Sequence, residues 1–306
     1  MASMLYQHLP SIVGVAGAGQ MGCGIAYSCA IKGIQVLLSD RKQDIVTNGM
    51  GNIQRLMERQ IKGNALSTEQ AHAAIALITP GISLEPFRQA DFVIEAVSEN
   101  EEVKANIFRQ LDKVTSVQTV LASNTSSISI TRLAAVTSKP HRVVGMHFQL
   151  PVHEQPLVEL ARGMHTSEGT FTAARSLAVH LGKVVAVSQD RPGFVMYRCL
   201  LPFINEAFFC LMEGTASAED IDKCLKLGTA MRQGPLRLAD SIGLDTCLAI
   251  MRTLHANLGD GKYRPCPLLV QYVDAGMLGV KTGKGIFMYE RGSPGDGTPH
   301  NVISFN

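Results

Sequence analysis

The sequence has little excess charge of either sign, and this excludes several classes of partner. Charged residues make up 18% of its 306 residues, and the formal net charge is only +2. Nucleic-acid binding usually requires a clustered basic surface, which this balance does not support. No uninterrupted apolar run approaches the roughly 18 residues that a membrane-spanning helix needs. With 46% hydrophobic residues, the chain is typical of a globular protein that we expect to bind neither nucleic acid nor a membrane.

Cysteine pairs at metal-binding spacing are also lacking. No Cys-x-x-Cys occurs, so we predict no metal site. Residues 1–10 contain no lysine or arginine and no long apolar core, unlike a secretory signal. The final tripeptide, Ser304-Phe305-Asn306, does not match the usual peroxisomal one. We therefore expect a cytoplasmic protein with reduced thiols at its seven scattered cysteines, which are Cys23, Cys29, Cys199, Cys210, Cys224, Cys247 and Cys266.

Apolar runs alternate with helical periods over the first 190 residues. Residues 12–15 form an apolar run that ends in a glycine cluster, 21–31 have helical length, and 35–39 return to β-type residues. Strand, turn, helix and strand in this order make a βαβ unit. Helices at 44–62 and 103–113 continue the alternation, which favours a mostly parallel sheet covered on both faces. Further strands are predicted at 91–95, 119–122, 143–147, 157–160 and 184–187.

The pattern changes after Gln189, where Arg191-Pro192-Gly193 breaks the alternation. From there to about residue 274 we find helical periods and no convincing strand. The sequence therefore predicts an α/β Rossmann-type domain with a mostly parallel sheet over residues 1–190, followed by a smaller all-α domain over 191–306. A tail from about residue 292, rich in glycine, proline and polar residues, is expected to be disordered. The predicted helices of the second domain are 194–212, 218–227, 244–258 and 267–274.

The first turn of the chain carries a nucleotide-binding pattern. Residues 17–22 read GAGQMG, a Gly-x-Gly-x-x-Gly between a strand and a helix. Gly17 permits the tight turn, Gly19 lets the backbone approach a pyrophosphate, and Gly22 lets helix and strand pack closely. The phosphates then meet free N–H groups at the positive end of the helix.

Asp40 strengthens this interpretation and indicates the cofactor. It ends the next strand, 18 residues after Gly22, where a carboxylate can accept hydrogen bonds from ribose hydroxyls. The same carboxylate repels a 2′-phosphate, so the pattern favours NAD over NADP. The adjacent Arg41 could face such a phosphate, which makes the preference a moderate one.

The reaction must come from a second set of residues, because Rossmann domains host many activities. The polar stretch at 123–127, Ser-Asn-Thr-Ser-Ser, follows one predicted strand, and His147 ends another. Glu159 is a carboxylate within the otherwise apolar stretch 157–160. Histidine is the natural general base near neutral pH, and a buried carboxylate can fix its tautomer. From the residues alone, the pair is either catalytic or purely structural.

Several stretches resemble the 3-hydroxyacyl-CoA dehydrogenase family. The resemblance runs in order from about residue 11 to residue 289, and the C-terminal half is similar to the short-chain 3-hydroxybutyryl-CoA branch. It implies a homodimer that oxidises or reduces a short 3-hydroxyacyl-CoA with NAD in fatty acid metabolism. The stretches are GAGQMGCGIA at 17–26, VIEAVSEN at 93–100, ASNTSSISI at 122–130, GMHF at 145–148, LVEL at 157–160, 190–195, and KTGKG at 281–285.

The resemblance also implies a role for individual residues. His147 would take the proton of the 3-hydroxyl as hydride leaves C3 for the nicotinamide, Glu159 would pair with His147, and Ser126 would hydrogen-bond the reacting oxygen. Binding residues are implied at Glu99, Lys104 and Lys281 for NAD, and at Lys62, with Arg59 behind it, for the 3′-phosphate-ADP end of CoA.

Three departures fall where the family contacts the nicotinamide and the acyl group. The family's His-Phe-x-Asn-Pro reads HFQLP at 147–151, which puts Leu150 in place of an amide. Its Pro-Gly-Phe-x-x-Asn-Arg reads PGFVMYR at 192–198, so that Tyr197 takes a substrate-contacting Asn position. Its Asn-His-Pro-Met-Gly-Pro reads AMRQGP at 230–235. Because the three chemical residues are kept, altered substrate choice or reduced activity explains the departures better than loss of function.

Two alternatives stay open at this point. A β-hydroxyacid dehydrogenase of the 6-phosphogluconate type, acting on a non-CoA substrate, shares the Gly-x-Met-Gly turn. That group relies on a lysine in the second domain, whereas the pairing of His147 with Glu159 points away from it. A catalytically weakened family member kept for a binding or structural role is supported only by Leu150 and Tyr197.

Overall fold

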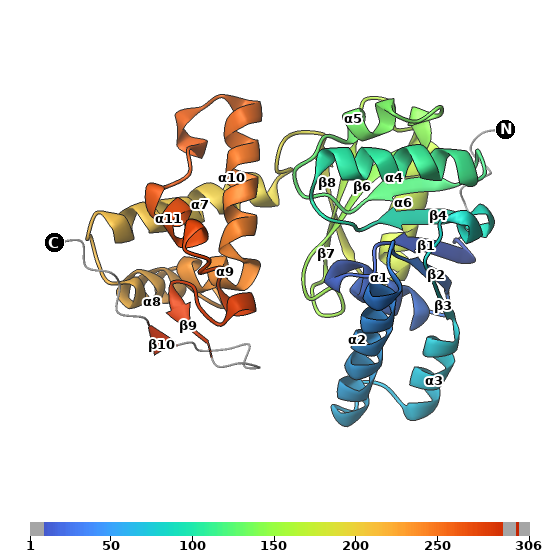
Figure 1. The fold of residues 1–306 in the computed structure, drawn as a ribbon, viewed down its shortest axis with the longest axis horizontal. Coiled ribbons are helices and arrows are strands. Elements are labelled where there is room, and N and C mark those ends of the chain that lie inside the picture. Colours follow the sequence, from blue (N-terminus) through green and yellow to red (C-terminus); the bar gives the residue numbers. More distant parts are fainter. Residues whose placement is uncertain (1–8, 290–297, 300–306) are drawn as a thin grey trace. The chain divides into compact units, whose positions relative to one another are not determined.

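The chain divides into two compact units, Met1–Phe194 and Val195–Asn306 (Figure 1). The computed structural model describes residues 9–289 together with 298 and 299. The predicted disordered tail from about residue 292 lies outside the described residues, apart from 298 and 299. These two form the short strand β10 (Thr298–Pro299), which pairs antiparallel with β9 (Phe287–Met288).

The N-terminal unit is built on one eight-stranded sheet with the strand order β3-β2-β1-β4-β5-β6-β7-β8. Every neighbouring pair is parallel except β6 and β7, which are antiparallel. The predicted Rossmann-type, mostly parallel sheet is thereby confirmed, and the order of its first six strands is that of a dinucleotide-binding domain. The strands are β1 (Ile12–Ala16), β2 (Gln35–Ser39), β3 (Ile78–Gly81), β4 (Phe92–Glu95), β5 (Val120–Ser123), β6 (Val143–Phe148), β7 (Leu157–Arg162) and β8 (Val184–Gln189).

Helices cover both faces of this sheet, which explains why its central strands are apolar runs rather than alternating ones. Buried side chains of the sheet form two clusters, one beneath α1, α2, α3 and α6 and the other beneath α4, α5 and the short helix η1. A further 3-10 turn, η2 (Pro140–Arg142), precedes β6. The helices are α1 (Gln20–Ala30), α2 (Gln43–Lys62), α3 (Thr68–Ala76), η1 (Glu85–Gln89), α4 (Glu101–Val114), α5 (Ile130–Ala135) and α6 (Glu168–His180).

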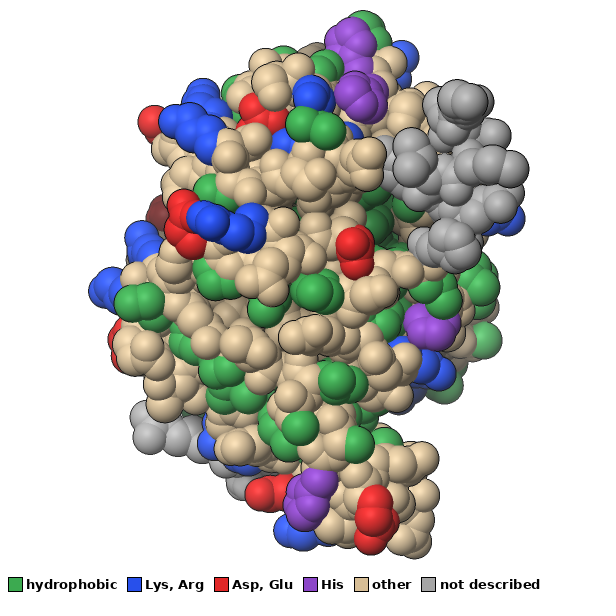
Figure 2. Space-filling view, turned by 90° about the vertical axis from the view of Figure 1, so that its right-hand side faces the viewer, with side chains coloured by type: hydrophobic (Ala, Val, Ile, Leu, Met, Phe, Trp, Pro, Cys, Tyr) green, Lys and Arg blue, Asp and Glu red, His purple; other side chains and the backbone are tan. Residues whose placement is uncertain are grey.

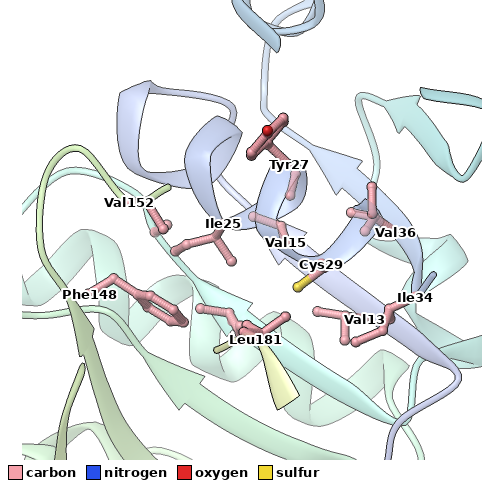
Figure 3. Packing of buried hydrophobic residues seen from close by; sticks show 14 of the residues in the cluster. Val13, Val15, Ile25, Tyr27, Cys29, Ile34, Val36, Phe148, Val152 and Leu181 are labelled. Carbon is pink, nitrogen blue, oxygen red and sulfur yellow. The ribbon is translucent and has the colours of Figure 1, made fainter. Parts of the chain in front are cut away.

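The packing of the first cluster decides where the end of β6 points. Figure 3 shows Val13 and Val15 of β1 against Ile25 and Cys29 of α1, within the same cluster as Phe148. Phe148 is only 1% exposed. Because successive side chains of a strand point to opposite faces, burying Phe148 here turns the preceding residue toward the α4 and α5 face.

The C-terminal unit is helical, as predicted, apart from the short β9–β10 pair. Its first helix, α7, begins two residues later than the predicted 194, because Gly193 and Phe194 both have positive φ, 76° and 47°. Leu201, Phe208 and Leu248 are among the residues of its core. The elements are α7 (Met196–Met212), α8 (Ala218–Gly228), α9 (Pro235–Ile242), α10 (Leu244–Leu258), η3 (Gly261–Tyr263), α11 (Pro267–Asp274) and η4 (Val280–Thr282).

Three further observations concern the charge on the surface, the length of the helices and the state of the cysteines. Figure 2 shows basic side chains interspersed with acidic and apolar ones on the face in view. Across the described residues, no helix combines the length and the apolar character needed to cross a bilayer. All seven cysteines are free thiols.

A buried carboxylate organises the end of the C-terminal unit. Asp240 of α9 is 1% exposed. It accepts hydrogen bonds from the backbone N–H groups of Ile286 at 3.0 Å and Phe287 at 2.9 Å, and from the Tyr289 hydroxyl at 2.9 Å. Burial raises the pKa of Asp240 to about 6. Ionising this carboxyl therefore costs stability even though the contacts fix the start of β9.

We expect replacement of Asp240 by Asn to change how stability depends on pH. The pKa of Asp240 in the folded state lies above its unfolded value, so its contribution is present below about pH 4 and is lost as pH rises through about 6. When the pH is raised from 4 to 7, the free energy of unfolding of the wild type should fall by about 2–3 kcal/mol relative to that of Asp240→Asn. Denaturant titrations measure this difference, with Asp274→Asn on the exposed end of α11 as control. A difference that does not vary with pH would contradict it.

Candidate active site

The register of the sheet brings four polar side chains to one face. In the parallel part, Glu95 of β4 is level with Ser123 of β5, which is level with Gly145 of β6. His147 lies two residues beyond Gly145 and therefore projects on the same side. Across the antiparallel pair, His147 stands directly opposite Glu159 of β7. Strands that are far apart in the sequence thus place their polar residues together at the carboxyl edge of the sheet.

His147 and Glu159 form a buried cross-strand pair. The imidazole Nδ1 lies 3.1 Å from Glu159 Oε2, and the two residues are 4% and 2% exposed. An ionised carboxylate can only accept, so the hydrogen bond places the proton on Nδ1 and leaves Nε2 as the acceptor nitrogen of the neutral ring. The pair has the arrangement that holds a general base in a single tautomer.

The glycine-rich turn follows β1. After this strand the chain passes to one face of the sheet, whereas after the neighbouring strand β4 it passes to the other face. Gly17 has φ of 114°, and a Cβ there would fall 2.5 Å from the Ala96 carbonyl oxygen, just after β4. A Cβ at Gly22 would fall 1.8 Å from the Gly17 carbonyl oxygen, so only glycine allows α1 to start this close to the turn. At Gly19 a Cβ would meet nothing within 4 Å, and no side chain caps α1 there. The first N–H groups of α1 are therefore suited to a pyrophosphate.

Asp40 is tied to this turn. It follows β2, and its Oδ2 accepts a hydrogen bond of 2.9 Å from the Ala18 N–H. Its Oδ1 accepts from the Arg41 N–H at 2.7 Å. Each carboxylate oxygen can accept more than one hydrogen bond, so these contacts hold the group in place and leave it capacity for ribose hydroxyls.

Glu99 collects the polar stretch that follows β5. Its Oε1 accepts from the Thr125 hydroxyl at 2.5 Å and from the Ser126 N–H and hydroxyl at 2.9 and 3.1 Å. The Ser127 N–H and hydroxyl are each 3.1 Å from the same oxygen. Burial opposes ionisation, but the charge of Lys104 and these hydrogen bonds outweigh it and lower the pKa of Glu99. The structure thus brings the predicted residues Glu99 and Ser126 into direct contact.

Lys104 lies behind Glu99 and is almost fully buried, at 1% exposed. Its ammonium donates to Glu95 Oε1 at 2.7 Å and lies 3.4 Å from Glu99 Oε2. Glu95 also accepts from the Ser123 hydroxyl at 2.7 Å. Sequence reasoning missed Glu95, although a carboxylate in the otherwise apolar strand Phe92–Glu95 is the same signal that singled out Glu159.

The other predicted site residues belong to α2 and to the C-terminal unit. Lys62 and Arg59 are exposed in the last turn of α2. Tyr197 and Lys281 belong to the C-terminal unit, where Tyr197 packs against the helical core and Lys281 forms an ion pair with Asp245. No group of three or more His, Cys, Asp or Glu in the described part of the chain is arranged to hold a metal ion.

The N-terminal unit carries a glycine-rich turn at the switch point of a Rossmann sheet, and a helical unit follows it in the chain. This is the architecture of a two-domain dinucleotide-dependent dehydrogenase. Two family models match the chain. The model of the NAD binding domain of 3-hydroxyacyl-CoA dehydrogenase covers residues 12–191, and that of the C-terminal domain of the same enzyme covers residues 193–289. The chain therefore belongs to the 3-hydroxyacyl-CoA dehydrogenase family, which confirms the resemblance found in its motifs.

Several relatives match over nearly their whole length. A 3-hydroxybutyryl-CoA dehydrogenase of Bradyrhizobium diazoefficiens is 49% identical over 282 residues, which is 92% of this chain and 96% of that protein. A probable 3-hydroxybutyryl-CoA dehydrogenase of Bacillus subtilis is 48% identical over 90% of this chain and 96% of its own. The crystal structure of (S)-3-hydroxybutyryl-CoA dehydrogenase from Ralstonia eutropha is 45% identical, with a TM-score of 0.87 over 92% of this chain and 99% of that one.

Two alanine substitutions in the turn should separate folding from cofactor binding. Gly22→Ala should lower Tm by about 3 °C or more, because its methyl group collides with a carbonyl oxygen. Gly19→Ala should leave Tm within about 2 °C of wild type, since its methyl group meets no protein atom, yet weaken NADH binding about tenfold or more by blocking the approach of the pyrophosphate. Thermal unfolding and NADH fluorescence titration measure the two effects. Wild-type NADH affinity in Gly19→Ala would mean that the dinucleotide lies elsewhere.

Proposed function

We propose that this protein is an NAD-dependent dehydrogenase that transfers hydride between NAD and C3 of a short-chain 3-hydroxyacyl-CoA, of the 3-hydroxybutyryl-CoA and acetoacetyl-CoA type. The observation that carries the proposal is the buried pair of His147 and Glu159 at 3.1 Å, on the strand edge that also bears the dinucleotide turn. The names of the relatives support the short acyl chain, since several of them are 3-hydroxybutyryl-CoA dehydrogenases.

The turn fits the cofactor on the geometry of its own residues. Gly17 and Gly22 shape the turn, Gly19 leaves one side open, and Asp40 is held where it can accept from ribose hydroxyls. When bound, NAD supplies the acceptor for the hydride. Glu99 and Lys281 are proposed to line the same site. The buried Lys104 would act there through its ion pairs with Glu95 and Glu99.

His147 would carry the proton transfer. As hydride leaves C3 of the hydroxyacyl group, the C3–O bond becomes a carbonyl and the hydroxyl proton passes to Nε2 of the imidazole. Glu159, hydrogen-bonded to Nδ1–H, stabilises the imidazolium that forms. In the reverse direction the imidazolium returns this proton to the oxygen. The ring therefore acts as base for oxidation and as acid for reduction.

Ser126 would hydrogen-bond the reacting oxygen. In the structure its hydroxyl donates to Glu99, but Glu99 Oε1 also accepts from the N–H of Ser126 and from Thr125 and Ser127. The Ser126 hydroxyl can therefore turn toward a substrate oxygen without leaving the carboxylate unpaired. A donor aimed at developing charge in this position contributes to the rate.

The last part of the proposal concerns the residues that would bind the substrate and the oligomeric state of the protein. The exposed cations Lys62 and Arg59 at the end of α2 offer charge for the 3′-phosphate-ADP end of CoA. Tyr197 would contact the acyl part, with Leu150 as the second departure that retunes it. A homodimer in the cytoplasm completes the proposal, supported by the family resemblance and by the free thiols.

An NADH oxidation assay tests the function directly. Acetoacetyl-CoA should be reduced with NADH, free acetoacetate should not, and longer 3-ketoacyl-CoAs rank the acyl-chain preference. NADH should be used about tenfold better than NADPH or more in kcat/KM, because Asp40 repels a 2′-phosphate. Folded protein that turns over none of these thioesters would overturn the proposal, and equal use of the two cofactors would remove the role given to Asp40.

A further inference from the structure

Glu95, the last residue of β4, is a fully buried carboxylate beside the proposed NAD site. It is 0% exposed. Its Oε1 accepts hydrogen bonds from the Val97 N–H and from the Lys104 ammonium, both at 2.7 Å, and its Oε2 accepts from the Ser123 hydroxyl at 2.7 Å. Both oxygens thus bind protein donors, and no part of the side chain reaches the surface. Glu95 can therefore act on a ligand through Lys104 but cannot touch one.

Lys104 joins this buried carboxylate to a second one that reaches the surface. Its ammonium lies 2.7 Å from Glu95 Oε1, 3.4 Å from the Val97 carbonyl oxygen and 3.4 Å from Glu99 Oε2. The three acceptors match its three N–H donors. The Lys104 side chain is 1% exposed, whereas that of Glu99 is 32% exposed. One ammonium between two carboxylates leaves a surplus negative charge, and Glu99 presents it to the outside.

The surplus charge lies on the half of the sheet that we assign to the nicotinamide. A Rossmann sheet binds a dinucleotide across its two halves. Asp40, after β2, serves the adenosine half, whereas Glu99 and Ser126 follow β4 and β5 of the other half. Ser126 Oγ is 3.1 Å from Glu99 Oε1. With Ser126 bonded to the reacting oxygen, as proposed, hydride-transfer geometry puts the nicotinamide within about 11 Å of the Glu99 carboxylate.

We propose that Glu95, Lys104 and Glu99, the Glu–Lys–Glu triad, make the site discriminate between the two oxidation states of its cofactor. The nicotinamide ring carries a positive charge in NAD and none in NADH. A surplus negative charge at this distance attracts the oxidised ring and not the reduced one. The triad therefore stabilises bound NAD relative to bound NADH and favours reduction of the 3-keto group on the enzyme. The inference rests on the proposed function.

The dissociation constants of NAD and NADH test the inference without any substrate. Each Kd is measured by calorimetry at low ionic strength. Glu99→Gln, which removes the charge and keeps the shape, should raise the ratio of Kd for NAD to Kd for NADH about fivefold or more. Glu95→Gln should raise the ratio too, although its side chain is buried, because Lys104 then neutralises Glu99. A purely structural loss would weaken the binding of both forms by the same factor and leave the ratio unchanged.

Asp40→Asn is the matched control. It removes a carboxylate from the adenosine half of the proposed site, which is chemically identical in NAD and NADH. Both Kd values should therefore rise by the same factor, and their ratio should stay within about twofold of the wild-type ratio.

The outcomes separate this inference from the proposed function. A ratio that Glu99→Gln leaves unchanged or lowers would overturn the inference, even if both forms bind more weakly. A rise in Glu99→Gln without one in folded Glu95→Gln would contradict the role of the triad. If Glu95→Gln fails to fold, Glu99→Gln decides, because its side chain lies partly at the surface. A wild type that binds neither NAD nor NADH would instead overturn the proposed function itself.

Discussion

The antiparallel pairing of β6 with β7 is the constraint on which the proposed chemistry depends. In a sheet that is otherwise parallel, this one reversal sets His147 directly opposite Glu159, twelve positions apart in the sequence. A slip of one residue would turn either side chain to the other face of the sheet. Phe148 opposes that slip, because its ring is buried on the opposite face, in the cluster beneath α1 and α6. Core packing on one side of the sheet thus fixes the polar pair on the other.

A buried lysine near the same edge lies between two carboxylates. Lys104 is neutralised by Glu95 and Glu99, and Glu99 in turn binds the backbone and hydroxyls of the segment that contains Ser126. Burying these groups without partners would cost several kcal/mol each, so the network is stable only as a whole. It positions Ser126 through the loop after β5 much as Phe148 positions His147 through β6. The loop that contains Ser126 and the proposed acid–base pair are therefore supported by separate packing arrangements.

Local pattern predicted much of the fold but few of the contacts. Periodicity predicted α10 and α11 with the bounds that the structure shows, because apolar residues recur at helical spacing in both. It missed β3, where Pro80 and Gly81 interrupt a four-residue strand, and α5, a six-residue helix. The N-terminus of α5 is capped by Asp190, sixty residues away, through the Ile130 N–H. In the site, His147 and Glu159 were identified as candidates from the sequence, whereas Glu95 acquires its partners Lys104 and Ser123 only through the tertiary fold.

The central claim is that His147 and Glu159 act as one unit, and a double-mutant cycle tests it most directly. The measured quantity is kcat/KM for acetoacetyl-CoA reduction in the wild type, His147→Ala, Glu159→Gln and the double variant. Glu159→Gln should cost about 10–100-fold when His147 is present, because the carboxylate acts by orienting and stabilising the imidazole. In the His147→Ala background the same change should cost less than about twofold. Equal losses in the two backgrounds would show that Glu159 acts independently of His147 and would contradict the account.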